Sequence, residues 1–85
     1  MNITDVMNGI VSNKIDIEKC QQLIHQFNKL NKTNYFIRVL NVNNTELVGT
    51  SDFNTNRINI TLVNAIPDKS DIGYSSGYIT AYDIG

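Results

Sequence analysis

The feature that most constrains the fold of this chain is a long polar segment, residues 43–56, between two segments of strand-forming residues. Residues 35–42 and 57–63 are rich in aromatic and β-branched side chains, which is typical of β-strands. A right-handed crossover between these two strands would make them parallel. A helical pattern precedes the first strand, and this helix would then cover one face of the sheet. Parallel strands usually connect through a helix. A polar loop as the crossover is therefore unusual.

Two helices are predicted before the first strand. Apolar residues at helical spacing predict a short helix over residues 4–12, with Thr4 or Asp5 as its N-cap. A longer helix begins after Asp16, which is a suitable N-cap, and ends at residues 31–34. Its apolar stripe consists of Ile17, Cys20, Leu23, Ile24, Phe27 and Leu30.

The third strand is predicted over residues 78–84, after a second loop over residues 64–77. We therefore expect one α+β domain spanning residues 1–85, with a small mixed sheet packed against one main helix. The second strand should bury Ile58, Ile60 and Leu62 on one face. Arg57 and Asn59 then project together from the opposite face.

Composition excludes several classes of function. The net charge is −1 and lysines and arginines are scattered, which argues against a nucleic-acid partner. No apolar run is long enough to span a membrane. Cys20 is the only cysteine and the N-terminal residues do not resemble a secretory signal, so we expect a cytoplasmic protein.

No constellation of residues predicts catalysis or a bound cofactor. Cys20 lies on the apolar stripe of the longer helix, which favours a buried structural thiol over a nucleophile. His25 lies five residues later, so it does not share the helix face of Cys20. Because it is the only histidine, a metal site with the usual ligands is not expected. We expect neither an enzyme nor a cofactor-binding protein.

Two apolar features leave alternatives open. Leu47 and Val48 interrupt the polar segment, and they either anchor it to the domain or offer an apolar contact to a partner. Tyr74, Tyr78 and Tyr82 could form a binding surface. Strand tyrosines in small sheets more often pack in the core or across strands.

The segment from residue 50 to residue 60 resembles the reactive-site segment of the potato inhibitor I family of serine-protease inhibitors. The similarity lies in the runs Thr50-Ser51-Asp52-Phe53 and Asn56-Arg57-Ile58-Asn59-Ile60. The preceding strand, with Val39-Leu40-Asn41-Val42, and the ending Gly77-Tyr78-Ile79-Thr80-Ala81 through Gly85 are similar to the family pattern too. The pattern is closest to that of the short bacterial relatives.

The resemblance implies a protein inhibitor that inserts its loop into a serine protease like a substrate. The implied protease-binding loop consists of Val48, Gly49, Thr50, Ser51, Asp52, Phe53 and Asn54. The scissile bond would be Ser51–Asp52, and a small polar Ser51 would suit a subtilisin-like or elastase-like pocket. Arg57 and Asn59 are the implied loop supports, with Arg57 bracing Asp52 and Asn59 bracing Thr50. A charge-assisted bond is suited to that role because it is strong and directional.

Two other functions remain open. A non-inhibitory binding module, such as a viral or phage interference factor, could use the same loop on another protein. A stefin-like inhibitor of cysteine proteases is also considered, because residues 33–39 are similar to a strand of that family. The hairpin that should precede that strand is missing, since residues 28–31 continue a helix.

Overall fold

A computed structural model describes residues 2–47, 49, 52–69 and 72–85. Two helices precede the strands: α1 (Ile3–Ser12) and α2 (Ile17–Asn31). The strands are β1 (Phe36–Val42), β2 (Thr45–Glu46), β3 (Arg57–Pro67) and β4 (Tyr74–Ile84). They form one sheet in the order β2-β1-β3-β4, in which β1 and β3 are parallel and the other neighbours are antiparallel. The predicted α+β class and the parallel pair flanking the polar segment are thus confirmed.

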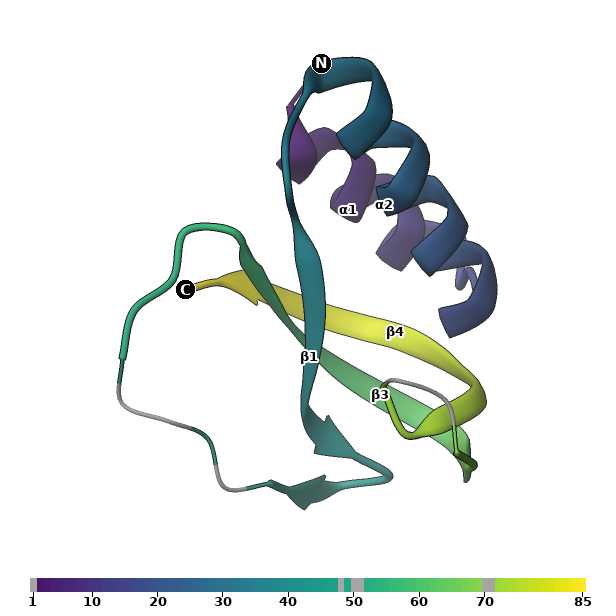
Figure 1. Cartoon of the computed structure of the whole chain (residues 1–85). Helices are drawn as coiled ribbons and strands as arrows, with labels where there is room; N and C mark the ends of the chain where they lie inside the picture. Colours follow the sequence, from purple (N-terminus) through teal and green to yellow (C-terminus); the bar gives the residue numbers. More distant parts are fainter. Residues whose placement is uncertain (1, 48, 50–51, 70–71) are drawn as a thin grey trace.

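Both helices lie on one side of the sheet and both contact β4 (Figure 1). The sequence analysis predicted the short first helix but packed the sheet against one main helix, so the contribution of α1 to this layer is a correction. Met7 and Ile10 of α1 are fully buried, and Cys20 and Ile24 of α2 are buried beside them. The sheet contributes Ile58, Ile60, Leu62 and Ile79 to this core, including the three β3 residues predicted for it.

The ends of the helices differ in part from the prediction. Asn2, rather than Thr4 or Asp5, is the N-cap of α1, because its side chain accepts a bond from the Asp5 N–H at 3.0 Å while the Asp5 carboxylate accepts one from the Asn2 N–H. Asp16 caps α2 as predicted, accepting from the Lys19 N–H at 2.9 Å. Leu30 is 83% exposed, because it lies at the edge of the stripe where α2 ends.

The bounds predicted for the second loop, residues 64–77, are both wrong, because β3 continues to Pro67 and β4 begins at Tyr74. Two irregularities in the strands made these residues resemble a loop. Asn64 has a positive φ of 55° where the register between β3 and β4 shifts. Gly77 has a φ of 132°, and a Cβ there would lie 2.9 Å from Leu62 Cγ. Glycine in this strand therefore permits a close approach between strands.

The strand β2 was not predicted. It forms a two-residue hairpin with β1, and Asn43 and Asn44 between them have φ values of 49° and 67°. Positive φ at both positions suits the right-handed twist of the strands, and asparagine tolerates it. The Asn43 side chain also donates to the Ala65 carbonyl at 3.2 Å and accepts from the Ala65 N–H at 3.0 Å. It thereby ties the hairpin to the irregular part of β3.

The structure answers the remaining expectations about apolar residues. Leu47 packs against the core, which favours an anchor; Val48 lies outside the described residues. Tyr74 and Tyr82 pack against the core as expected, whereas Tyr78 is 43% exposed and does not. In the described part of the chain, no helix is long and apolar enough to cross a membrane.

Candidate functional site

The candidate site is the segment between β2 and β3 together with the residues that hold it. Figure 1 shows the described residues of this segment on the side of the molecule away from the helices. The structure describes Leu47, Gly49 and residues 52–56 of it. Val48, Thr50 and Ser51, which the sequence analysis placed in the protease-binding loop, lie outside the described residues.

Arg57, the first residue of β3, holds Asp52 at two points. Its Nη2 donates to the Asp52 carbonyl oxygen at 2.8 Å. Its Nη1 donates to Asp52 Oδ2 at 3.3 Å, which is also an ion pair. Because the backbone and the side chain of Asp52 are both bound by one planar guanidinium, the peptide unit is fixed in orientation as well as position. The predicted pairing of Arg57 with Asp52 is confirmed.

The two partners of this contact differ in their exposure to solvent. The side chain of Arg57 is 8% exposed, whereas that of Asp52 is 60% exposed. A carboxylate so open to water contributes at most about 1 kcal/mol as an ion-pair partner. A bond between a charged donor and a carbonyl contributes about 1.5–3 kcal/mol. The bond to the Asp52 carbonyl is therefore the larger restraint on the loop.

The second support residue, Asn59, binds Gly85. Its Nδ2 donates to the Gly85 carbonyl oxygen at 3.0 Å, and its Oδ1 accepts from Arg38 Nε at 2.9 Å. Arg57 Nε donates to the same Gly85 oxygen at 3.0 Å, and the Gly85 N–H donates to the Arg57 carbonyl at 3.0 Å. Asn59 is only 7% exposed, and these bonds satisfy both ends of its amide. Gly85, which follows β4, thus fixes the position of the Arg57 guanidinium that binds Asp52.

Phe53 and Asn54 connect the held residue to β3. The Phe53 ring lies against Gly85, where an added Cβ would be 2.8 Å from the Phe53 Cε2 atom. The ring is nevertheless 74% exposed. The Asn54 side chain accepts from the Asn56 N–H at 2.9 Å, and the Arg57 N–H donates to the Asn54 carbonyl at 3.1 Å. This side-chain turn directs the chain into β3.

Gly49, in the same segment, lies beside two side chains of β1. A Cβ on Gly49 would lie 3.0 Å from Leu40 Cδ2 and 3.8 Å from the guanidinium carbon of Arg38. Since Arg38 also donates to Asn59, the segment is supported from two neighbouring strands. At this end of the sheet Arg57 and Asn59 are buried on the outer face, and Ile58 and Ile60 are buried on the face that the helices cover.

The structure brings together part of the predicted site. Asp52, Phe53 and Asn54 lie close to Arg57, as the sequence analysis expected. The predicted bracing of Thr50 by Asn59 falls on a residue outside the described ones, and the partners recorded for Asn59 are Gly85 and Arg38. The roles of Gly85 and Arg38 were missed. The signal for Arg38 was available, since it lies on the same side of β1 as Leu40, facing the loop.

The chemistry of this site is that of a constrained peptide, since its groups hold a backbone segment. Among the described residues, no group of three or more histidine, cysteine, aspartate or glutamate side chains could hold a metal ion. Cys20 is fully buried, and this burial raises the pKa of its thiol to about 12, with a smaller contribution from the charge of Asp16. Cys20 therefore carries a protonated thiol near neutral pH.

Comparisons with protein-family models, with curated proteins and with solved structures found no match to the chain.

Proposed function

We propose that the chain is a protein inhibitor of a subtilisin-like or elastase-like serine protease, with a fold of the potato inhibitor I type. The observation that carries this proposal is the double contact of Arg57 with Asp52, at 2.8 Å to the carbonyl and 3.3 Å to the carboxylate. Asp52 follows Ser51, the residue whose carbonyl carbon the protease would attack. The contact is thus adjacent to the proposed scissile bond.

Rigidity would explain inhibition in physical terms. An enzyme cleaves a bound peptide because it stabilises the transition state, so a substrate-like loop is expected to be cut. If Arg57 holds Asp52 after the bond is broken, the new amino group stays beside the acyl-enzyme and religation competes with hydrolysis. A loop ordered beforehand also avoids a cost of about 0.5–1.5 kcal/mol per side chain immobilised on binding.

The arrangement around Gly85 supports the same proposal. A guanidinium that only contacted an exposed carboxylate could swing away with its partner. Here its Nε is held by the Gly85 oxygen, which Asn59 also binds. Arg57 is therefore fixed from the side opposite the loop, as a rigid support requires.

The test measures residual activity of subtilisin, pancreatic elastase and papain after mixing with the protein, with product masses followed over time. We expect stoichiometric inhibition of a serine protease, slow cleavage at Ser51–Asp52 at most, and no inhibition of papain. Arg57→Ala should weaken inhibition at least about tenfold, equivalent to about 1.4 kcal/mol, and should make the loop a substrate.

Lys19→Ala is the matched control, because it removes a cationic side chain on the exposed face of α2 and should leave inhibition unchanged. Rapid cutting of the loop without inhibition would contradict the proposal. The segment would then serve a non-inhibitory contact, for which the exposed ring of Phe53 is available. Inhibition of papain alone would favour the stefin-like alternative.

A further inference from the structure

Among the described residues, a short stretch of the outer edge of β1 has no neighbouring strand. On that side β1 pairs with β2 only through Asn41 and Val42, and the Leu47 N–H donates to the Leu40 carbonyl at 2.7 Å. The other side of β1 pairs with β3 along its length. Among the described residues, the part of β1 before Leu40 therefore forms an edge of the sheet.

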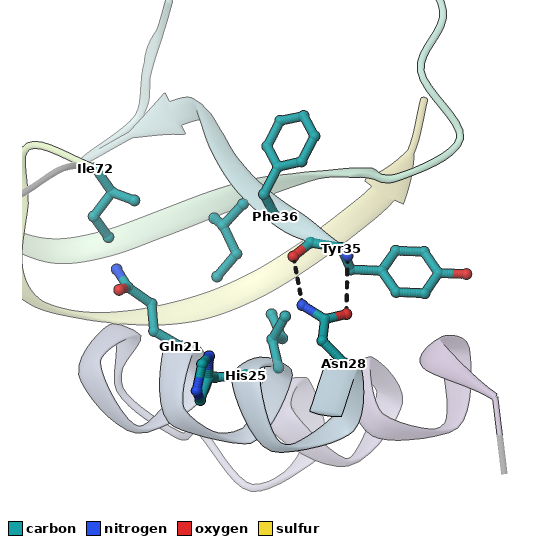
Figure 2. A pocket seen from close by; sticks show the side chains of 8 residues that line it. Gln21, His25, Asn28, Tyr35, Phe36 and Ile72 are labelled. Atoms are coloured by element: carbon teal, nitrogen blue, oxygen red, sulfur yellow. Dashed lines mark hydrogen bonds between the residues drawn. The ribbon is translucent and has the colours of Figure 1, made fainter. Parts of the chain in front are cut away.

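The backbone groups on this edge belong to alternate residues. The Phe36 N–H donates toward β3, to the Asn56 carbonyl at 2.9 Å. In a parallel pair, alternate residues direct both backbone groups to the same neighbour, so those of Tyr35, Ile37 and Val39 point to the outer edge. The Asn28 side chain of α2 binds both groups of Tyr35, each at 2.9 Å (Figure 2). Between this contact and β2, no described residue pairs with Ile37 and Val39 on this edge, and we call these two residues the window.

A groove lies beside the window on the helix side of the sheet. It consists of two hollows of about 360 and 400 Å³, which share Ile37 and Ile72. Figure 2 shows α2 along one wall of the first hollow, with Gln21 and His25, and Ile72 on the wall near the β3–β4 turn. Ile24 of α2 also lines this hollow and Val39 the second. The floor at Ile37 and Val39 is only partly buried.

We propose that this edge binds an extended segment of a partner protein as an added antiparallel strand, with apolar side chains in the groove. The residues opposite Ile37 and Val39 would exchange backbone hydrogen bonds with them and direct their side chains into the two hollows. The residue between them would lie opposite Arg38 on the outer face, where the Arg38 side chain keeps its bond to Asn59 and its positive charge favours an acidic residue on the neighbouring strand. The proposal is independent of the protease-inhibitor function.

A second copy of the chain fits this edge poorly. The window exposes the backbone N–H and C=O groups of only two residues. A symmetric antiparallel pair that uses the groups of both residues must place Ile37 opposite Val39 of the other copy. Arg38 would then face Arg38 across the axis, and like charges directly opposite each other are destabilising. The Asn28 contact and the β2 hairpin at the two ends of the window would also meet their symmetry copies. A free extended segment avoids both the repulsion between two Arg38 side chains and the clash at the ends of the window.

The probe for this site is the capped peptide acetyl-Lys-Thr-Leu-Glu-Leu-Thr-Lys-amide, titrated into ¹⁵N-labelled protein. We expect saturable shifts of the Ile37 and Val39 amides and slower hydrogen exchange at both. The control peptide has N-methyl groups on both leucines, which removes the two donors but keeps the side chains. It should bind at least about tenfold more weakly, since two bonds of about 1 kcal/mol each are lost.

Two variants on the β3–β4 hairpin test the groove separately. Ile72→Lys places a charge in both hollows and should weaken binding about tenfold. Ile66→Lys is the matched control, because Ile66 is already exposed and does not line the groove. Equal binding of the N-methylated peptide, or shifts confined to other residues, would overturn the proposal. Protection of Ile37 and Val39 that grows with protein concentration without peptide would also overturn it, and would assign the edge to a second copy.

Discussion

At the residue scale, the position of the loop between β2 and β3 depends on the surroundings of one side chain, that of Arg57. Arg57 is the first residue of β3, and its three side-chain nitrogens donate to Asp52 in the loop and to Gly85 after β4. Burial makes these bonds more effective than those of a surface arginine, because water does not compete for the guanidinium. The exposed Asp52 carboxylate matters less than the backbone carbonyl beside it. One residue therefore couples segments far apart in the sequence.

The buried thiol of Cys20 predicts a stability change at alkaline pH. Its pKa is 9.0 ordinarily and about 12 in the folded protein, so the folded state keeps a proton that the unfolded state loses. The free energy of unfolding should be unaffected by this group below pH 9. Between pH 9 and 12 it should fall by about 1.4 kcal/mol per pH unit.

The measurement is urea unfolding from pH 8 to pH 11 for the natural protein and for Cys20→Ala. Lysines and tyrosines titrate in the same range in both proteins, so the difference between the two curves isolates the thiol. Parallel curves would show that the thiolate is not disfavoured in the fold. The native protein should also react slowly with a thiol reagent until it is unfolded.

At the element scale, side chains and glycines shape the strands where regular pairing stops. Asn28 and Asn43 each bind both backbone groups of a single residue, Tyr35 and Ala65 respectively. These side chains take the place of a neighbouring strand at positions that regular pairing does not reach. Without them, buried or half-buried backbone groups would lose a partner at a cost of about 1–3 kcal/mol each.

Two glycine substitutions should have opposite effects on stability. Gly77→Ala should lower the free energy of unfolding by about 1–3 kcal/mol, because the new Cβ would meet Leu62 Cγ at 2.9 Å and the Val63 oxygen at 3.1 Å. Gly9→Ala in α1 should raise it by up to about 1 kcal/mol, since nothing lies within 4 Å of the new Cβ. Chemical denaturation of both variants provides the measurement. Similar values for the two would contradict the close approach at Gly77.

At the scale of the whole molecule, the last residue of the sequence and the central loop form one unit. Gly85 receives bonds from Arg57 and Asn59, donates one to Arg57, and contacts the Phe53 ring. The helices take no part in this unit, since they lie on the opposite face of the sheet (Figure 1). The loop and the helical layer are thus stabilised by separate sets of contacts across a shared sheet.

A variant that ends at Ile84 tests this coupling. Without Gly85, two buried donors lose their shared acceptor, so the free energy of unfolding should fall by about 1–3 kcal/mol. Hydrogen exchange of the Phe53 and Asn54 amides should become faster than in the natural protein, because Arg57 is no longer held. The control adds one serine after Gly85, which keeps every Gly85 bond and should leave both measurements unchanged. Unchanged exchange in the shortened variant would show that the loop is held without Gly85.

Local patterns in the sequence determined the helices and the parallel pair, whereas the contact between Asp52 and Arg57 was expected only from the resemblance to a known family. Helical spacing, the Asp16 cap and strand alternation are properties of neighbouring residues, and they place Ile58 and Ile60 opposite Arg57 and Asn59. Only the tertiary structure decided the extent of β3 and β4, the cap by Asn2, and the binding of Asn59 to Gly85. Asparagine and glycine were compatible with loop, turn or strand at these positions, and the choice between them depended on partners distant in the sequence.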